Sequence, residues 1–215
     1  MRDISVRTTK EVSVPVEQLY KIRKSAFSQW EEAGLDASEA HCQMKAFADS
    51  LRTKTVFVAH DTATGELLAM HAVRLNRHRK VASGSDLAVL RISQHEGIAT
   101  RMLQVETERL SKTGYRYMSE STAIPAKWSV KWHLKNGYHI TGYKRSEKKN
   151  YASYILRKPL ALNYCRHPQD LLWLSPIAPF TARLYYITSY LVTCICKKQN
   201  GKLTTVGRIA KKLLK

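Results

Sequence analysis

The spacing of hydrophobic residues changes repeatedly over positions 1–160, and each change predicts a different element. Short apolar or alternating runs rich in β-branched residues indicate strands, whereas apolar residues three or four positions apart indicate helices. The order β-α-α-β-β-β-α-β-α-β-β predicts a mixed sheet covered by helices, an α/β (α+β) fold. Strands are predicted at 4–8, 53–59, 67–75, 87–90, 115–121, 138–149 and 151–158, and helices at 16–33, 38–51, 97–114 and 126–136.

The stretch 87–114 predicts a strand that enters a helix through a polar turn. Gly97 opens the helix, and the first amides of a helix lack hydrogen-bond partners and carry partial positive charge. Such a turn is a site for an anion, and the small residues Gly97 and Ala99 let a phosphate approach the backbone. The apolar residues at helical spacing are Ile98, Met102, Val105 and Leu110.

The residues of this turn resemble a known family signature. Gln94–Ala99, QHEGIA, resembles the Q/RxxGxG/A motif of the GNAT (GCN5-related N-acetyltransferase) family. Leu87–Val89 precedes it, where the family places the strand that pairs with pantetheine, and Lys135–Tyr138, KNGY, resembles the family's KxGF/Y at the end of a later helix. The resemblance covers residues 1–160 and implies a GNAT-like, mostly antiparallel sheet of six to seven strands, with acetyl-CoA as co-substrate.

The resemblance also implies which residues hold acetyl-CoA. In the family, main chain at the positions of Leu87 and Val89 holds pantetheine and helps to orient the acetyl carbonyl. The family commonly has an Asn early in the second helix, but Ala126 stands at its position here, and Ser129 offers a hydroxyl instead. The backbone amides expected to bind the pyrophosphate are those of Gln94, Gly97, Ile98, Ala99 and Thr100.

Acetyl transfer from a thioester to an amine needs a neutral amine and a proton for the departing thiolate. The family often supplies that proton from a tyrosine four residues before the glycine of the second motif, where this chain has His133. An imidazole is only partly protonated at neutral pH, so His133 is interpreted as the acid, as a proton acceptor or as a hydrogen-bond cap. Glu120 is the first choice for the base and Asp86 the second, with deprotonation through water as the alternative.

Four aromatic side chains have two interpretations each, core packing or ligand contact. In the family, the helical region 16–51 borders the acceptor pocket, which gives Phe27 and Trp30 a functional alternative to packing. Trp128 and Trp132 share one face of the helix 126–136, and for both of them core packing is the preferred interpretation.

The composition and the charge of the chain favour anionic binding partners but do not identify one class of them. The 215 residues suit one domain with an appendage, and a net charge of +19 attracts anions such as nucleotides, acidic substrates, nucleic acid or anionic lipid. The four cysteines have neither disulfide-framework nor zinc spacing, and MRDISVRTTK at the start lacks the apolar segment of a signal peptide. We therefore expect a cytoplasmic protein without a metal.

The segment 161–215 lies beyond the resemblance and is predicted to be a helical, basic extension of the domain 1–160. Its apolar run, 184–196, is shorter than the roughly 20 residues that span a bilayer, and 197–215 carries seven basic residues and no acid. The range 184–215 fits packing or homo-oligomerisation, peripheral contact with an anionic membrane, or, least of all, nucleic acid.

Together these observations predict an acetyl-CoA-dependent N-acetyltransferase that acts on the amine of a small molecule or peptide by direct transfer in a ternary complex. One alternative is a GNAT-fold scaffold with little catalysis that binds a membrane surface or nucleic acid. Another is a transferase that uses a longer acyl-CoA.

Overall fold

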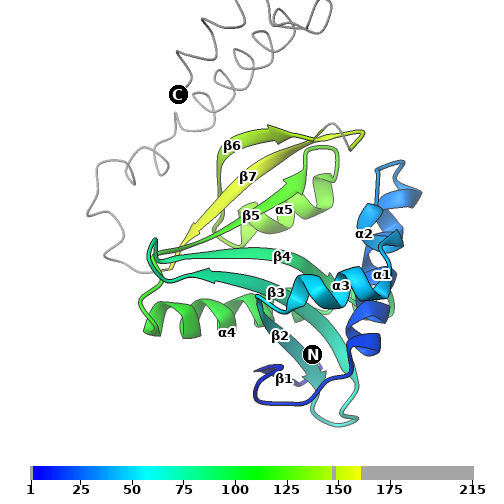
Figure 1. The fold of residues 1–215 in the computed structure, drawn as a ribbon, viewed down its shortest axis with the longest axis vertical. Coiled ribbons are helices and arrows are strands. Elements are labelled where there is room, and N and C mark those ends of the chain that lie inside the picture. Colours follow the sequence, from blue (N-terminus) through cyan, green and yellow to red (C-terminus); the bar gives the residue numbers. More distant parts are fainter. Residues whose placement is uncertain (1, 147–148, 161–215) are drawn as a thin grey trace, which may run out of the picture.

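A computed structural model describes residues 2–146 and 149–160, and the fold is given for these ranges. Seven strands form one sheet in the order β1-β2-β3-β4-β5-β7-β6 (Figure 1). The strands are β1 (Ile4–Thr8), β2 (Thr55–Asp61), β3 (Leu67–Asn76), β4 (Val81–Val89), β5 (Tyr117–Ala123), β6 (His139–Arg145) and β7 (Ala152–Pro159). The helices are α1 (Val16–Glu32), α2 (Ser38–His41), α3 (Met44–Leu51), α4 (Ile98–Lys112) and α5 (Lys127–Lys135), with a 3₁₀ turn, η1 (Arg91–Ser93), before α4.

The sheet has a hydrophobic core on each face, because alternate side chains of a strand point to opposite sides. In β2, Val56 and Val58 pack with α1 and α3, whereas Phe57 and Ala59 belong to the core that includes α4. The two helices that flank the central strands therefore bury their apolar stripes on opposite faces, α1 through Leu19 and Ile22, and α4 through Ile98, Met102 and Leu110.

Only the contact between β4 and β5 is parallel, and it is short. Val81, Ala82 and Ser83 pair with Tyr117, Met118 and Ser119, and the ladder between these strands ends there. All other neighbouring strands pair antiparallel. Figure 1 shows β4 and β5 meeting at one end and separating toward the side where α1 and α2 lie. The predicted architecture, a mixed and mostly antiparallel sheet of six to seven strands with flanking helices, is confirmed.

The single helix predicted at 38–51 is wrong, because the chain breaks between α2 and α3. Cys42 and Gln43 have extended backbone angles. Side chains of α1 hold this break: the Tyr20 hydroxyl donates to the Cys42 carbonyl at 2.8 Å, and the Arg23 guanidinium donates to the Glu39 carbonyl. These carbonyls are satisfied by α1, so the helix does not need to continue through them.

The strand predicted at 87–90 is the last part of a longer one, because β4 begins at Val81. Small and polar residues occupy its first half, so the hydrophobic pattern missed it. Asp86 has φ of 56°, and the β3–β4 register shifts at Met70 and Ala72, which marks a bulge beside the point where β4 and β5 separate.

The predictions for 161–215, a helical extension with partner contacts through 184–215, lie outside the described residues. Within the described ranges, none of the helices combines the length and the apolar character that crossing a membrane requires.

Candidate active site

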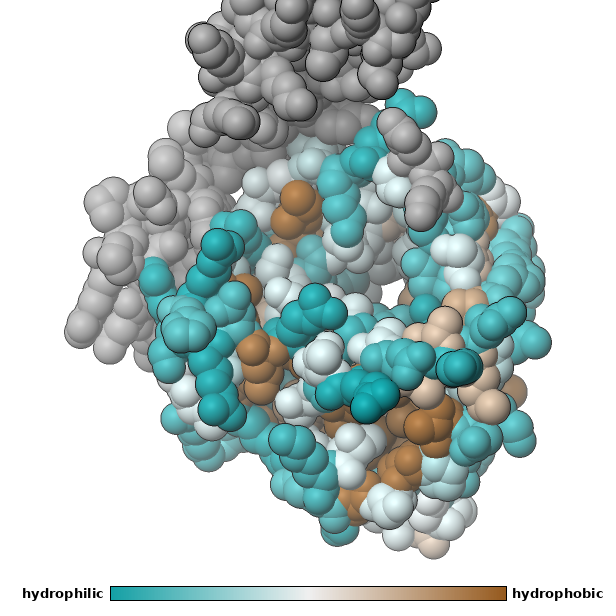
Figure 2. All heavy atoms as spheres, viewed as in Figure 1, coloured by the Kyte–Doolittle hydropathy of each residue, from teal (hydrophilic) through white to brown (hydrophobic). Residues whose placement is uncertain are grey.

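The separation of β4 and β5 opens a cleft of about 930 Å³ that is lined by residues from α1, β4, α4, β5 and α5. Figure 2, viewed as in Figure 1, shows an opening in the surface of the molecule. All ten site residues named from the sequence line it: Leu87, Val89, Gln94, Gly97, Ile98, Ala99, Thr100, Glu120, Ser129 and His133.

At one end of the cleft, the turn before α4 presents free backbone donors. Gly97 caps the helix with φ of 82°, a left-handed conformation that costs glycine little, and a side chain there would meet no other atom of the protein within 4 Å. In the described part of the chain, no acceptor is found for the backbone amides of Gly97, Ile98, Ala99 and Thr100. This open cradle of amides at a helix N-terminus fits a phosphate group.

The Gln94 amide differs from the other four. It donates to the Arg91 carbonyl within η1 at 3.3 Å, so it is not a free donor like the amides of α4. The Gln94 side chain instead donates to the Val89 carbonyl at 3.3 Å. This contact fixes the turn to the end of β4. Gln94 therefore positions the anion cradle, and its amide is not one of the free donors of that cradle.

At the other end of the cradle, two helices are tied together. The indole N–H of Trp132 in α5 donates to the Thr100 hydroxyl at 3.2 Å, which fixes α5 against the first turn of α4. Trp132 also packs against the core, as the sequence predicts. Trp128, one turn earlier, is 42% exposed and lines the cleft, so the core-packing prediction for it is wrong.

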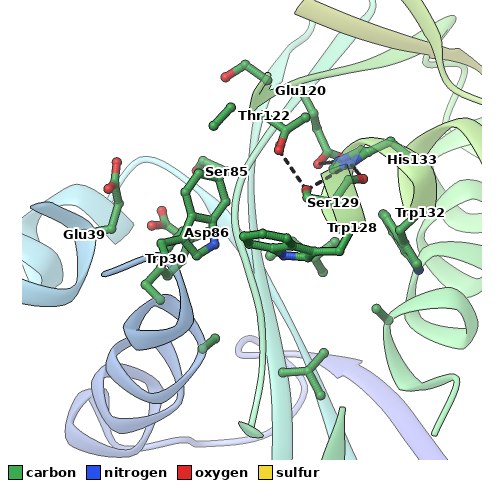
Figure 3. Close-up of a pocket in the computed structure, with 18 of the residues that line it drawn as sticks. Trp30, Glu39, Ser85, Asp86, Glu120, Thr122, Trp128, Ser129, Trp132 and His133 are labelled. Atoms are coloured by element: carbon green, nitrogen blue, oxygen red, sulfur yellow. Dashed lines mark hydrogen bonds and ion pairs between the residues drawn. The ribbon is translucent and has the colours of Figure 1, made fainter. Parts of the chain in front are cut away.

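Deeper in the cleft, Glu120 and His133 form a buried pair. The Nε2 atom of His133 lies 3.1 Å from Oε2 of Glu120, and the Tyr138 hydroxyl donates to Oε1 of the same carboxylate. The other ring nitrogen, Nδ1, lies 2.7 Å from the Ser129 carbonyl one turn back in α5. Since both nitrogens face an oxygen that accepts, a hydrogen on each of them satisfies both contacts. Ser129 is in turn held by the Thr122 hydroxyl, which donates to it at 2.7 Å (Figure 3).

Sequence reasoning missed a second buried pair behind Glu120. Nδ1 of His71 in β3 lies 2.8 Å from Oε2 of Glu106 in α4, and the two side chains are 1% and 0% exposed. The other nitrogen, Nε2, faces Oε1 of Glu120 at 3.9 Å. A signal was present in the sequence: Glu106 stands four residues after Met102 and four before Leu110, on the buried stripe of α4, where an unpaired carboxylate is costly.

The charges of this network set the pKa of each carboxylate. Burial by itself raises the pKa of Glu120, but the charge of His71 and the contacts from His133 and Tyr138 lower it to about 2. Burial lowers the pKa of His71, yet the charges of Glu106 and Glu120 outweigh it and raise that pKa to about 9. Burial raises the pKa of Glu106 and the charge of Glu120 adds to this effect, whereas the contact with His71 lowers that pKa without outweighing burial. Glu120 is therefore an anion at neutral pH.

Asp86, the second choice for the base, lines the cleft but has two cationic partners. Arg23 Nε lies 2.7 Å and Lys54 Nζ 3.3 Å from its carboxylate oxygens. Burial raises the pKa of Asp86, but these two cations outweigh burial and bring that pKa below its ordinary value. This arrangement favours a structural ion pair over a proton acceptor.

Neither a family model nor a curated protein matches this sequence. Its fold matches solved structures of N-acetyltransferases. The ribosomal-protein-S18-alanine N-acetyltransferase of Escherichia coli is 16% identical with a TM-score of 0.58, covering 78% of this chain and 99% of that one. A spermidine N-acetyltransferase chimera from Vibrio cholerae is 9% identical with a TM-score of 0.58, covering 76% and 99%.

A third similar structure contains the expected co-substrate. It is a GNAT family acetyltransferase from Elizabethkingia anophelis with acetyl-CoA bound, 12% identical with a TM-score of 0.55, and the match covers 73% of this chain and 97% of that one. At these identities the matches establish a common fold.

Proposed function

The described part of the chain has the GNAT fold, and on that premise we propose that the protein is an N-acetyltransferase that moves an acetyl group from acetyl-CoA to an amine. The observation that supports this proposal most is the position of the Gly97 cradle in the same cleft as the Glu120–His133 pair. One site binds diphosphate and the other handles protons, which are the two tasks of the reaction.

The residues present fit acetyl-CoA, which supplies an activated acetyl thioester when bound. The free amides of Gly97, Ile98, Ala99 and Thr100 would hold its pyrophosphate. Leu87 and Val89 line the cleft in the part of β4 that no longer pairs with β5, where they would hold the pantetheine arm. Direct transfer in a ternary complex requires the amine to enter beside this arm.

Glu120 and His133 would form the proton path. The incoming ammonium loses its first proton to water, because Glu120, with a pKa of about 2, is too weak a base to take it. The neutral nitrogen then bonds to the acetyl carbon, and as the carbon–sulfur bond breaks, Nε2 of His133 gives its hydrogen to the departing thiolate. The nitrogen that has formed the new bond is now strongly acidic and loses its surplus proton to Glu120, which passes it across the 3.1 Å contact to the vacated Nε2, so the pair returns to its starting form. Ser129 and Thr122 hold the imidazole in place for this exchange.

A glycine exchange tests the cradle. Gly97→Leu places a side chain where the phosphate would approach, so we expect the affinity for acetyl-CoA to fall. The expected loss is at least about tenfold, which corresponds to about 1.4 kcal/mol of binding free energy. Isothermal calorimetry measures the affinity, and release of free thiol measures turnover. Gly65→Leu is the matched control: Gly65 has φ of 71° and open space around it, as Gly97 does, but it lies outside the cleft.

The two variants separate the backbone strain of a leucine at positive φ from the loss of phosphate binding. Equal affinities for acetyl-CoA in Gly97→Leu and Gly65→Leu would contradict the assignment of the Gly97 turn as the phosphate site. A parent protein that binds no acetyl-CoA would overturn the enzymatic proposal and favour the scaffold interpretation.

A further inference from the structure

The acceptor side of the cleft differs in character from the cradle end. It is lined by residues of α1, α2 and α5, by Tyr151 just before β7 and by Ser153 at the start of β7. Figure 3 shows Trp30 of α1 and Trp128 of α5 next to each other in the cleft, with Glu39 and Asp86 to one side. These side chains come from elements far apart in the sequence, so the tertiary structure alone brings them together.

Aromatic rings cover this side of the cleft. Trp128 meets Trp30 edge to face, with ring centroids 6.2 Å apart, and Tyr151 lies 5.9 Å from Trp30 on the other side. Phe27, one turn before Trp30, is the fourth ring of this group, and its centroid lies 5.7 Å from that of Trp30. Trp128 is 42% exposed and lines the cleft, so part of its ring is open to a bound molecule. A flat ring entering the cleft would find partners for stacked or edge-to-face contacts.

The described carboxylates of the cleft are each engaged by a cation of this chain. Within residues 2–146 and 149–160, three acidic side chains line the cleft. Asp86 is held by Arg23 and Lys54, Glu39 is held by Lys149 at 2.7 Å, and Glu120 lies 3.9 Å from His71, whose pKa is raised to about 9. Five lysine and arginine residues of the same ranges line the cleft, so the described part of its wall carries an excess of positive charge.

Two of these aromatic rings already have a cation of this chain near their faces. The ammonium of Lys149 stands 5.7 Å from the centre of the Tyr151 ring, and the Arg23 guanidinium stands 5.9 Å from that of Phe27. A second cation at these faces would meet like charge. Binding of a ligand with several ammonium groups is therefore disfavoured, whereas binding of a neutral ring is not.

Resting on the proposed function, we infer that the acceptor is a monoamine attached to an aromatic ring, and that Trp30, Trp128 and Tyr151 bind this ring while its amine reaches Glu120. Polyamines and other acceptors with several ammonium groups are expected to be poorer acceptors, because each further charge would need a free carboxylate and the described residues of the cleft offer none. This assignment separates the chain from the spermidine N-acetyltransferase that shares its fold.

A panel of three amines tests the assignment on the full-length protein with acetyl-CoA. Thiol release is measured with 2-phenylethylamine, with hexylamine as an apolar amine without a ring, and with spermidine. We expect kcat/KM for 2-phenylethylamine to exceed that for hexylamine by about threefold to tenfold and that for spermidine by at least about tenfold. Spermidine equal to or better than 2-phenylethylamine would overturn the inference.

Trp128→Ala tests the ring contact, and Leu134→Ala is its matched control. Both residues lie on α5 with similar exposure, 42% and 45%, but Leu134 does not line the cleft. We expect Trp128→Ala to lower kcat/KM for 2-phenylethylamine by about threefold to tenfold and to lower kcat/KM for hexylamine by a smaller factor. Leu134→Ala should change neither. An equal loss for both amines in Trp128→Ala would contradict a ring-binding role.

Binding without turnover separates this inference from the proposed function. Quenching of tryptophan fluorescence by 2-phenylethylamine needs no reaction. If no amine is acetylated but 2-phenylethylamine still binds in a Trp128-dependent way, the ring subsite stands and the transferase proposal fails. If amines are acetylated but 2-phenylethylamine neither binds nor reacts preferentially, the ring subsite fails and the transferase proposal stands.

Discussion

At the scale of single residues, the candidate site depends on where each ionisable group finds its partner. Glu120 receives contacts from three sides, and the histidine at the position where the family often has tyrosine lies within reach of it. A phenol and an imidazole can each donate a hydrogen from the ring. Nε2 of His133 lies 3.1 Å from Glu120, so His133 places such a donor at the position where the family often has tyrosine.

His133→Ala removes the proton donor of the proposed path. We expect kcat to fall about 10²- to 10³-fold, the range of general acid catalysis, with acetyl-CoA affinity unchanged because the cradle is intact. Turnover measured between pH 6 and 9 and calorimetry check the two parts. His139→Ala, at an exposed position on β6, is the control. A His133→Ala protein with the parent's turnover and pH profile would rule out the acid role.

His71 provides a prediction about stability and pH. Its pKa is raised to about 9, so its contacts stabilise the fold fully below about pH 6.5 and lose that stabilisation as pH rises through 9. We expect the free energy of unfolding to fall by up to about 3 kcal/mol between pH 6.5 and 9.5, and this dependence to be largely absent in His71→Gln. Urea unfolding at several pH values measures it.

His60→Gln is the control for this series. His60 lies in the neighbouring strand β2, and burial and the charge of Arg7 lower its pKa instead of raising it. The free energy of unfolding of His60→Gln should therefore still fall between pH 6.5 and 9.5, as that of the parent protein does. The same loss in His71→Gln would show that another group causes it.

At the scale of elements, β4 determines the site more than any other strand. It pairs with β5 over three residues and then separates from it, and Gly84 lies just past that point. Gly84 leaves space for the contact between His71 of β3 and Glu120 of β5. A Cβ there would lie 2.6 Å from Nε2 of His71 and 2.8 Å from Cγ of Glu120, which is too close for either.

Gly84→Ala is therefore expected to destabilise the protein by about 1 to 3 kcal/mol and to lower turnover, because the added methyl group displaces the Glu120 side chain. Thermal unfolding and thiol release measure the two effects. Gly142→Ala in β6 is the matched strand control, since its Cβ would meet Ile155 at an ordinary 3.4 Å. Similar effects of the two substitutions would show that Gly84 is not tightly packed.

At the scale of the whole molecule, charge is the dominant property. The chain carries a net charge of +19 and acetyl-CoA is an anion, so long-range attraction should speed their association. We expect acetyl-CoA affinity to fall severalfold between 50 and 500 mM NaCl, because salt screens this attraction. Acetyl-pantetheine, which lacks the phosphates, should bind with little salt dependence. Equal salt dependence of both ligands would contradict an electrostatic contribution.

The sequence by itself determined the order of the elements, the mixed sheet and the Gly97 turn, because each of these depends on a local pattern. Hydrophobic spacing sets the elements, and a glycine before an amphipathic run sets the helix N-terminus. The same local evidence failed at α2 and α3, where side chains of α1 satisfy the backbone, and in the first half of β4, which has few apolar residues.

Only the tertiary structure decided what surrounds Glu120. His71, Glu106 and His133 come from β3, α4 and α5, and Tyr138 comes from the turn before β6; no local pattern connects a strand residue with a helix residue 35 positions away. The same holds for the ion pairs that neutralise Asp86 and for the aromatic wall. A pKa and a ligand preference depend on distances across the fold, and those distances exist only once β4 and β5 have separated.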